Sequence, residues 1–126
     1  MLFLIVCSGI LCSCRKGPGP GGKGTIKGKI YEYNYNKDFT SLQGEYYKGD
    51  HDVYIVYGDD SFYSDKISTH YDGSFQFEYL LPGSYTVYTY SQDNTLTTPG
   101  SIVVDKVTEL SKKEEKDIGT LYVYDN

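Results

Sequence analysis

The residues that most suggest chemistry are aromatic side chains in a polar segment, residues 34–50. The segment reads NYNKDFTSLQGEYYKGD and places Phe39, Tyr46 and Tyr47 among charged and amide side chains. Adjacent tyrosines gain little from a polar loop unless they contact something. Planar rings with hydroxyl edges suit the faces of sugars, so Phe39, Tyr46 and Tyr47 are candidate ligand-binding residues that would form a stacking platform.

A second interpretation of residues 34–50 needs no ligand. The segment can form an additional hairpin about Gly44, with Leu42 and Tyr46 covering an exposed sheet edge. The sequence leaves both interpretations open. They differ in whether Tyr46 and Tyr47 contact a partner outside the domain.

The titratable residues do not form a recognisable catalytic or metal-binding pattern. His51 and His70 each stand at the edge of a predicted strand, without a second histidine or a cysteine at metal-ligand spacing. The carboxylates of Asp59, Asp60 and Asp65 could hold calcium, but turn aspartates explain them as well. We therefore expect a protein that is not an enzyme, with no catalytic residue, metal or cofactor.

The three cysteines, Cys7, Cys12 and Cys14, all lie at the start of the chain, so the later residues contain no disulfide framework. Residues 1–12 are an apolar run that ends in small residues. At ~1.5 Å per helical residue this run is much shorter than the ~30 Å hydrocarbon core of a membrane. It is typical of a signal peptide.

The residues Leu11-Cys12-Ser13-Cys14 resemble the lipobox of bacterial lipoproteins, in which a leucine stands three residues before a cysteine that becomes lipidated. The resemblance implies a signal peptide at residues 1–13 and lipidation of Cys14. The lipid would anchor the chain in the outer membrane of a Gram-negative cell. The sequence does not indicate which face of that membrane the chain occupies. A secretory signal cleaved elsewhere and a buried N-terminal strand are the alternatives. Residues 14–23, rich in Gly and Pro, are expected to form a flexible tether.

Length and composition favour one small all-β domain. The 126 residues include 14 glycines, 15 tyrosines and 5 phenylalanines but no tryptophan. The net charge of -5 disfavours nucleic acid as a partner, because a phosphate-binding surface needs an excess of positive charge.

Short alternating runs between turn residues predict a sandwich of seven strands. We expect a core that includes Phe75, Phe77, Tyr85 and Val87, on either side of the Pro82-Gly83 turn. A charged stretch, residues 106–116, could hold one helical turn. The predicted strands are residues 25–33, 52–58, 62–69, 74–80, 84–91, 101–105 and 117–124.

The order of these motifs resembles the carboxypeptidase regulatory-like and transthyretin-like domains. The matching positions are Gly28 and Ile30, Val53 and Ile55, the run DGSFQF from Asp72 to Phe77, and the run LLPGSYTV from Leu80 to Val87. The resemblance implies that residues 24–126 form a seven-stranded Greek-key β-sandwich. Such domains usually serve as accessory, spacer or binding modules.

The alternation also places tyrosines on the outer faces of both sheets. Cross-strand aromatic pairing alone could explain these rings. We expect a lipid-anchored binding or accessory module that binds a glycan or an envelope protein. The alternatives are a spacer domain of an envelope assembly and a glycan-binding module of a polysaccharide-uptake system. The outward tyrosines are Tyr54, Tyr88 and Tyr90 on one sheet and Tyr31, Tyr122 and Tyr124 on the other.

Overall fold

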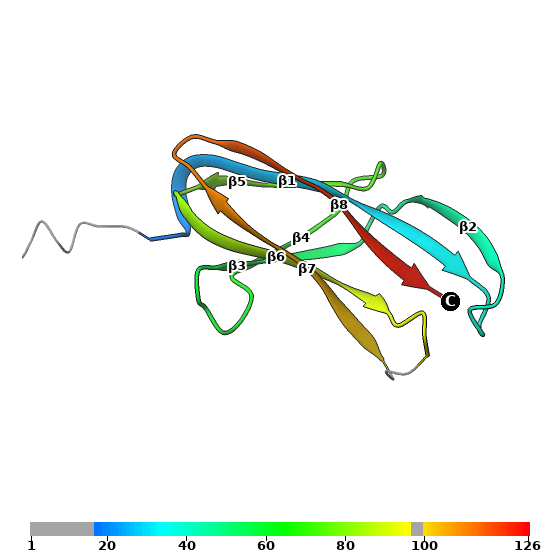
Figure 1. The fold of residues 1–126 in the computed structure, drawn as a ribbon. Helices are drawn as coiled ribbons and strands as arrows, with labels where there is room; N and C mark the ends of the chain where they lie inside the picture. Colours follow the sequence, from blue (N-terminus) through cyan, green and yellow to red (C-terminus); the bar gives the residue numbers. More distant parts are fainter. Residues whose placement is uncertain (1–16, 97–99) are drawn as a thin grey trace, which may run out of the picture.

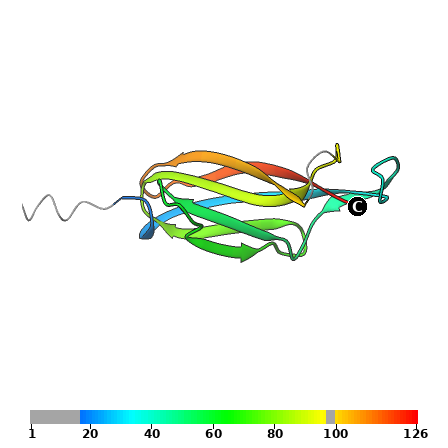
Figure 2. The same cartoon turned by 90° about the horizontal axis from the view of Figure 1, so that it is seen from below.

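Two four-stranded sheets lie face to face in the computed structural model, which describes residues 17–96 and 100–126 (Figures 1 and 2). Sheet A contains β1, β2, β5 and β8, and sheet B has the order β4-β3-β6-β7. The strands are β1 (Pro20–Tyr35), β2 (Leu42–Tyr47), β3 (Asp52–Tyr57), β4 (Asp65–Ser68), β5 (Ser74–Leu80), β6 (Gly83–Gln92), β7 (Ser101–Leu110) and β8 (Glu115–Asp125).

The long strand β1 organises sheet A. Its first half pairs antiparallel with β5 and its second half antiparallel with β2. On its other edge β1 pairs with β8 in parallel, from Thr25 opposite Glu115 to Asn34 opposite Asp125. The ladder between β1 and β8 shifts register between Lys27 and Lys29, beside Gly119, which has a positive φ of 83°. A glycine suits this bulge because it has no Cβ to clash.

The core lies between the sheets and is formed by alternate residues of both. The predicted core residues are confirmed: Phe75, Phe77, Tyr85 and Val87 are at most 4% exposed. The largest other core side chains include Ile26, Ile30, Val53, Ile55, Leu80, Leu110, Leu121 and Val123.

The prediction of an all-β sandwich is confirmed, but the structure has eight strands where seven were predicted. The additional strand is β2, inside residues 34–50, and its pairing with β1 makes this segment a hairpin. The turn of the hairpin is not at Gly44, which pairs with Asn34 within the ladder. It lies instead at residues 36–41, because β1 continues two residues beyond its predicted end at Tyr33.

Three further predicted boundaries differ from the structure by three residues or more. Strand β1 begins at Pro20, so residues 20–23 belong to a strand and not to a flexible tether. Strand β7 continues to Leu110, where the sequence suggested a helical turn, because Thr108 and Leu110 face inward while the charged residues face outward. Strand β4 starts only at Asp65, and Phe62 is 83% exposed.

The buried phenol of Tyr85 fixes the point at which the chain joins the sandwich. Its hydroxyl donates to the carbonyl of Leu81 at 2.6 Å and accepts from the backbone N–H of Gly19 at 2.8 Å. Because Tyr85 is fully buried, these bonds hold Gly19 against the turn between β5 and β6. The predicted signal peptide and Cys14 lie outside the described residues.

Within residues 17–96 and 100–126, no helix has the length and apolar character needed to cross a membrane.

Candidate functional site

The outer face of sheet A carries a continuous group of aromatic rings, which we call the sheet A aromatic surface. It extends from β2 across β1 to β8 and includes one ring from the turn between β1 and β2. Its members are Tyr31, Tyr33, Tyr35, Phe39, Tyr47, Tyr122 and Tyr124.

The backbone register explains why these rings meet. Alternate residues of β1 face outward, and Tyr31 stands opposite Tyr47 of β2 on one side and Tyr122 of β8 on the other. Tyr33 stands opposite Tyr124. The outward placement of Tyr31, Tyr122 and Tyr124 agrees with the alternation in the sequence.

The rings contact one another edge to face and in offset stacks. The centroid of Tyr31 lies 4.9 Å from that of Tyr47 and 6.0 Å from that of Tyr122. Tyr33 stacks with Tyr124 at 5.4 Å and an interplanar angle of 26°. These are favourable aromatic geometries, yet Tyr47 and Tyr122 remain 48% and 52% exposed. The surface is therefore ordered and accessible at its two sides.

Phe39 closes the end of this surface. Its ring lies 5.5 Å from that of Tyr35, although its φ of 55° is unusual for a residue other than glycine. The side chain of Asn36 organises the turn, because its Oδ1 accepts from the backbone N–H groups of Thr40 and Ser41. An Asx-type turn thus holds Phe39 against the last tyrosine of β1.

Tyr46 lies on the opposite side of the sheet from Tyr47. Its hydroxyl donates to Glu32 Oε2 at 2.9 Å and accepts from Asn34 Nδ2 at 3.1 Å. Glu32 is only 3% exposed, and Lys48 Nζ lies 3.9 Å from its carboxylate. The proposed platform of Phe39, Tyr46 and Tyr47 is therefore not formed: the structure groups Phe39 and Tyr47 with the strand tyrosines, while Tyr46 fastens β2 from the inner side.

Two hydroxyls of this surface, those of Tyr31 and Tyr33, have a raised pKa. The hydroxyl of Tyr31 donates to Glu45 Oε1 at 3.0 Å, and this hydrogen bond raises the pKa of Tyr31 above its ordinary value. Partial burial raises the pKa of Tyr33. Lys29 Nζ lies 4.7 Å from the ring centroid of Tyr47, a cation–π contact at one end of the surface.

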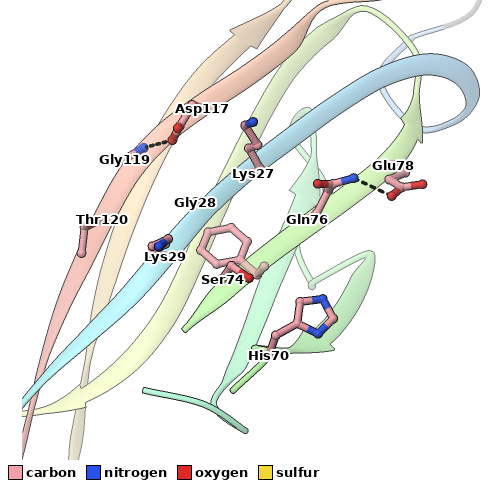
Figure 3. Close-up of a pocket in the computed structure, with 11 residues that line it drawn as sticks. Lys27, Gly28, Lys29, His70, Ser74, Gln76, Glu78, Asp117, Gly119 and Thr120 are labelled. Atoms are coloured by element: carbon pink, nitrogen blue, oxygen red, sulfur yellow. Dashed lines mark hydrogen bonds between the residues drawn. The ribbon is translucent and has the colours of Figure 1, made fainter. Parts of the chain in front are cut away.

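A polar hollow adjoins the aromatic surface where β5, β1 and β8 run side by side (Figure 3). Its volume is about 480 Å³. Lys29 belongs to both regions, since it lines the hollow and contacts Tyr47. This hollow was not predicted from the sequence, although Lys27 and Lys29 precede Tyr31 on the same outward face of β1. The polar lining includes Lys27, Lys29, Ser74, Gln76, Glu78, Asp117 and Thr120.

The outer face of sheet B carries a smaller group, the sheet B tyrosine cluster, formed by Tyr54, Tyr63, Tyr88 and Tyr90. Tyr54 and Tyr88 are cross-strand partners whose rings stack at 5.0 Å and 12°. Tyr63, from the connection between β3 and β4, packs on Tyr54 at 5.1 Å. The outward placement that the sequence predicts for Tyr54, Tyr88 and Tyr90 agrees with this cluster.

The titratable residues considered as catalytic or metal-binding groups lie apart. His51 Nε2 is 3.2 Å from the carbonyl oxygen of Tyr90, whereas His70 lines the hollow on sheet A. Asp60 accepts from the Ser64 hydroxyl, and Asp65 accepts from the backbone of Lys66. In the part of the chain that the structure describes, no three His, Cys, Asp or Glu residues are grouped so that they could hold a metal ion.

Comparison with known proteins identifies the fold alone. No protein-family model and no curated protein matches the chain. The structure is similar to the crystal structure of a Pseudomonas aeruginosa protein described as a "putative carbohydrate binding protein". The TM-score is 0.51 and the sequence identity 14%, over 82% of this chain and 90% of that chain.

Proposed function

We propose that this domain is a non-catalytic glycan-binding module that uses the sheet A aromatic surface. The observation that carries the proposal is a set of ordered rings on the outside of a sheet, where they add nothing to the core. The structural neighbour described as a carbohydrate binding protein supports the same class of ligand. A binding role is also consistent with the resemblance to carboxypeptidase regulatory-like domains, which usually serve as accessory, spacer or binding modules.

The chemistry of the surface suits sugars. One face of a sugar ring presents C–H groups, which pack on an aromatic ring and are removed from water there. The edge of the same sugar presents hydroxyls, which need both donors and acceptors. The protonated hydroxyls of Tyr31 and Tyr33, with the Glu45 carboxylate beside them, supply both kinds of partner.

We further propose that Cys14 is lipidated and anchors the chain in the outer membrane of a Gram-negative cell. The lipobox-like residues at its N-terminal side support this. Replacing Cys14 by Ser should leave an unprocessed precursor or release the chain from membranes extracted without detergent. A Cys14→Ser chain that is processed and membrane-bound like the wild type would show that the anchor is elsewhere.

The glycan proposal is tested by comparing two exposed tyrosines. Tyr122, on the sheet A aromatic surface, and Tyr90, in the sheet B tyrosine cluster, are 52% and 42% exposed. A glycan array first identifies ligands of the purified chain, and titration calorimetry then measures their affinity. We expect Tyr122→Ala to weaken binding at least about tenfold, the effect of losing ~1.4 kcal/mol of contact, and Tyr90→Ala to leave it unchanged.

Thermal melts of both variants would show that each is folded. Equal affinities for the wild type and a folded Tyr122→Ala chain would exclude the sheet A aromatic surface as the site. A folded chain that binds no glycan on the array would favour the spacer role.

A further inference from the structure

The outer face of β1 changes character at one point along the strand. Its outward residues are Lys27 and Lys29 and then Tyr31, Tyr33 and Tyr35. The neighbouring strands change at the same point. Gln76 of β5 and Asp117 of β8 stand opposite Lys27, Ser74 and Thr120 stand opposite Lys29, and Tyr47 and Tyr122 stand opposite Tyr31. Polar rows three strands wide are thus followed directly by aromatic rows.

The two halves together form one elongated surface. Lys27 and Tyr33 are separated by six residues, which in an extended strand is ~20 Å. That length is several times the width of one sugar ring. The polar half contains the hollow of about 480 Å³, whose lining residues are drawn in Figure 3. The aromatic half follows it along β1 on the same face of the sheet.

The hollow contains side chains of both charges, and most of them form ion pairs or hydrogen bonds within the protein. Lys27 Nζ lies 2.9 Å from Glu115 Oε1. The carboxylates of Asp117 and Glu78 accept from the Gly119 N–H and the Gln76 amide. Of the two lysines that line the hollow, Lys29 forms no ion pair with another described residue. Carboxylates beside the lysines would repel an anionic chain, and the protein as a whole carries a net charge of -5.

Donors and acceptors in comparable supply are what a polyol requires. The Lys29 ammonium and the Thr120 hydroxyl can donate, and the carboxylates of Glu78 and Asp117 can accept. The Ser74 hydroxyl donates to Asp72 Oδ1 at 2.6 Å, so toward a ligand its oxygen is an acceptor. A sugar hydroxyl does both. This balance favours neutral sugars over uronates or sulfated sugars, which would need an excess of cations.

From this arrangement we infer that the ligand is an extended neutral glycan lying along β1, with one sugar stacked on the sheet A aromatic surface and the following sugars placing their hydroxyls in the hollow. The inference rests on the proposed function and specifies its ligand class. Binding should strengthen with chain length, because a disaccharide occupies only part of the surface. Acidic glycans of the same length should bind more weakly.

The test titrates the purified full chain with neutral and acidic oligosaccharides. The neutral probes are cello- and malto-oligosaccharides from disaccharide to hexasaccharide, and the acidic probes are oligogalacturonates of the same lengths. At least one neutral series should gain about tenfold in affinity or more from disaccharide to hexasaccharide. Oligogalacturonates should bind at least about tenfold more weakly than that series.

A hollow variant separates the two halves of the surface. Gln76 and Glu78 are exposed on β5, so Gln76→Ala/Glu78→Ala should fold normally. It should weaken binding of the hexasaccharide more than binding of the disaccharide, so that the gain with length is largely lost. Asp105→Ala on β7, an exposed acidic position of the other sheet, is the matched control and should keep that gain.

The outcomes distinguish this inference from the proposed function. Affinity that is independent of length, an unchanged gain in the hollow variant, or oligogalacturonates that bind as tightly as the neutral series would each overturn the inference. Those results leave the aromatic surface in place if Tyr122→Ala still weakens binding at least about tenfold. Unchanged binding by Tyr122→Ala, or no binding of any probe, would overturn the proposed function and the inference with it.

Discussion

The two outer faces of the sandwich use the same residue type in different ways. The sheet B tyrosine cluster is compact: Tyr54 and Tyr88 stack directly, and Tyr63 from a connecting segment covers Tyr54. The hollow that borders it is smaller, about 280 Å³, and is lined in part by Asp50, His51 and Asp52. The sheet A aromatic surface is broader and continues into a larger hollow that contains cations and carboxylates. Tyrosine content alone therefore does not distinguish the two faces. They differ in the extent of the ring surface and in the size and lining of the neighbouring hollow.

Both faces rest on one core, and breaking that core should remove them together. Phe77 is 4% exposed between the sheets. Phe77→Ala should lower the free energy of unfolding by ~3–5 kcal/mol, which is enough to unfold much of so small a domain. Chemical denaturation measures this change. The matched control is Phe62→Ala, because Phe62 is 83% exposed and its loss should cost less than ~0.5 kcal/mol. A loss under about 1 kcal/mol for Phe77→Ala would contradict the assigned core.

The neighbours Tyr46 and Tyr47 should differ in how much stability is lost when the hydroxyl is removed. Tyr46→Phe leaves the buried Glu32 carboxylate without its phenol donor and should cost ~1–3 kcal/mol of unfolding free energy. For Tyr47 no hydrogen bond of the hydroxyl to another described residue is found, so Tyr47→Phe should change stability by less than ~0.5 kcal/mol. Denaturant midpoints measure both. Equal effects would mean that Tyr46 does not fasten β2.

Part of this arrangement could be predicted from the sequence, and part could not. Alternation in the strands was enough to place Phe75 and Phe77 inward and Tyr31 and Tyr122 outward. It could not show that Tyr122 lies beside Tyr31, because the pairing of β1 with β8 joins the two ends of the domain. The same limit hid the polar hollow, which three strands build together.

The predicted strand boundaries were wrong where the local composition is typical of a loop but the segment pairs with a distant strand. Pro20 and the glycines after it are typical of a tether, yet β1 starts there, because a proline is tolerated at the first residue of a strand and β5 pairs with this stretch. For Tyr46 and Tyr47 the sequence indicates opposite sides. Only the register of β2 decides that Tyr47 faces outward.

The ring pairs of the two faces should differ in how strongly they are coupled. Tyr54 and Tyr88 stack at 5.0 Å, whereas Tyr33 and Tyr122 stack at 6.0 Å and 21°. A double-mutant cycle with alanine at Tyr54 and Tyr88 should give a coupling of ~0.5–1.5 kcal/mol. The Tyr33 and Tyr122 cycle should give only ~0.2–0.5 kcal/mol, because the rings of this pair lie farther apart. A reversed order would mean that the sheet A rings serve chiefly to stabilise their sheet.

Ionisation of the tyrosines offers the smallest and most local comparison. The Glu45 carboxylate raises the pKa of Tyr31 by a hydrogen bond, whereas burial raises the pKa of Tyr88. Glu45→Ala should therefore lower the pKa of Tyr31 toward the ordinary ~10 and leave that of Tyr88 unchanged. NMR of ring-labelled tyrosine, titrated into the alkaline range, follows both phenols. A Tyr31 pKa that does not fall would show that the hydrogen bond is absent in solution.

The same shifts fix the sign of an alkaline stability effect. A phenol whose pKa is raised on folding holds its proton more tightly in the folded state than in the unfolded state. Its contribution is complete below the unfolded pKa of ~10 and is lost as the pH rises through the higher folded value. Denaturation midpoints should therefore fall above that pH, and midpoints that rise there would contradict the assigned shifts.

The parallel pairing of β1 with β8 has a mechanical consequence. The chain joins the sandwich at the start of β1, and β8 ends at the opposite end of the molecule (Figure 1). Tension applied between these two points would slide one strand along the other, so the hydrogen bonds of the ladder would be loaded together in shear. A hairpin pulled at its open end instead releases its bonds one after another. A force that pulls on the end of β8 while the chain is held near Gly19 would thus be resisted by the longest ladder that β1 makes.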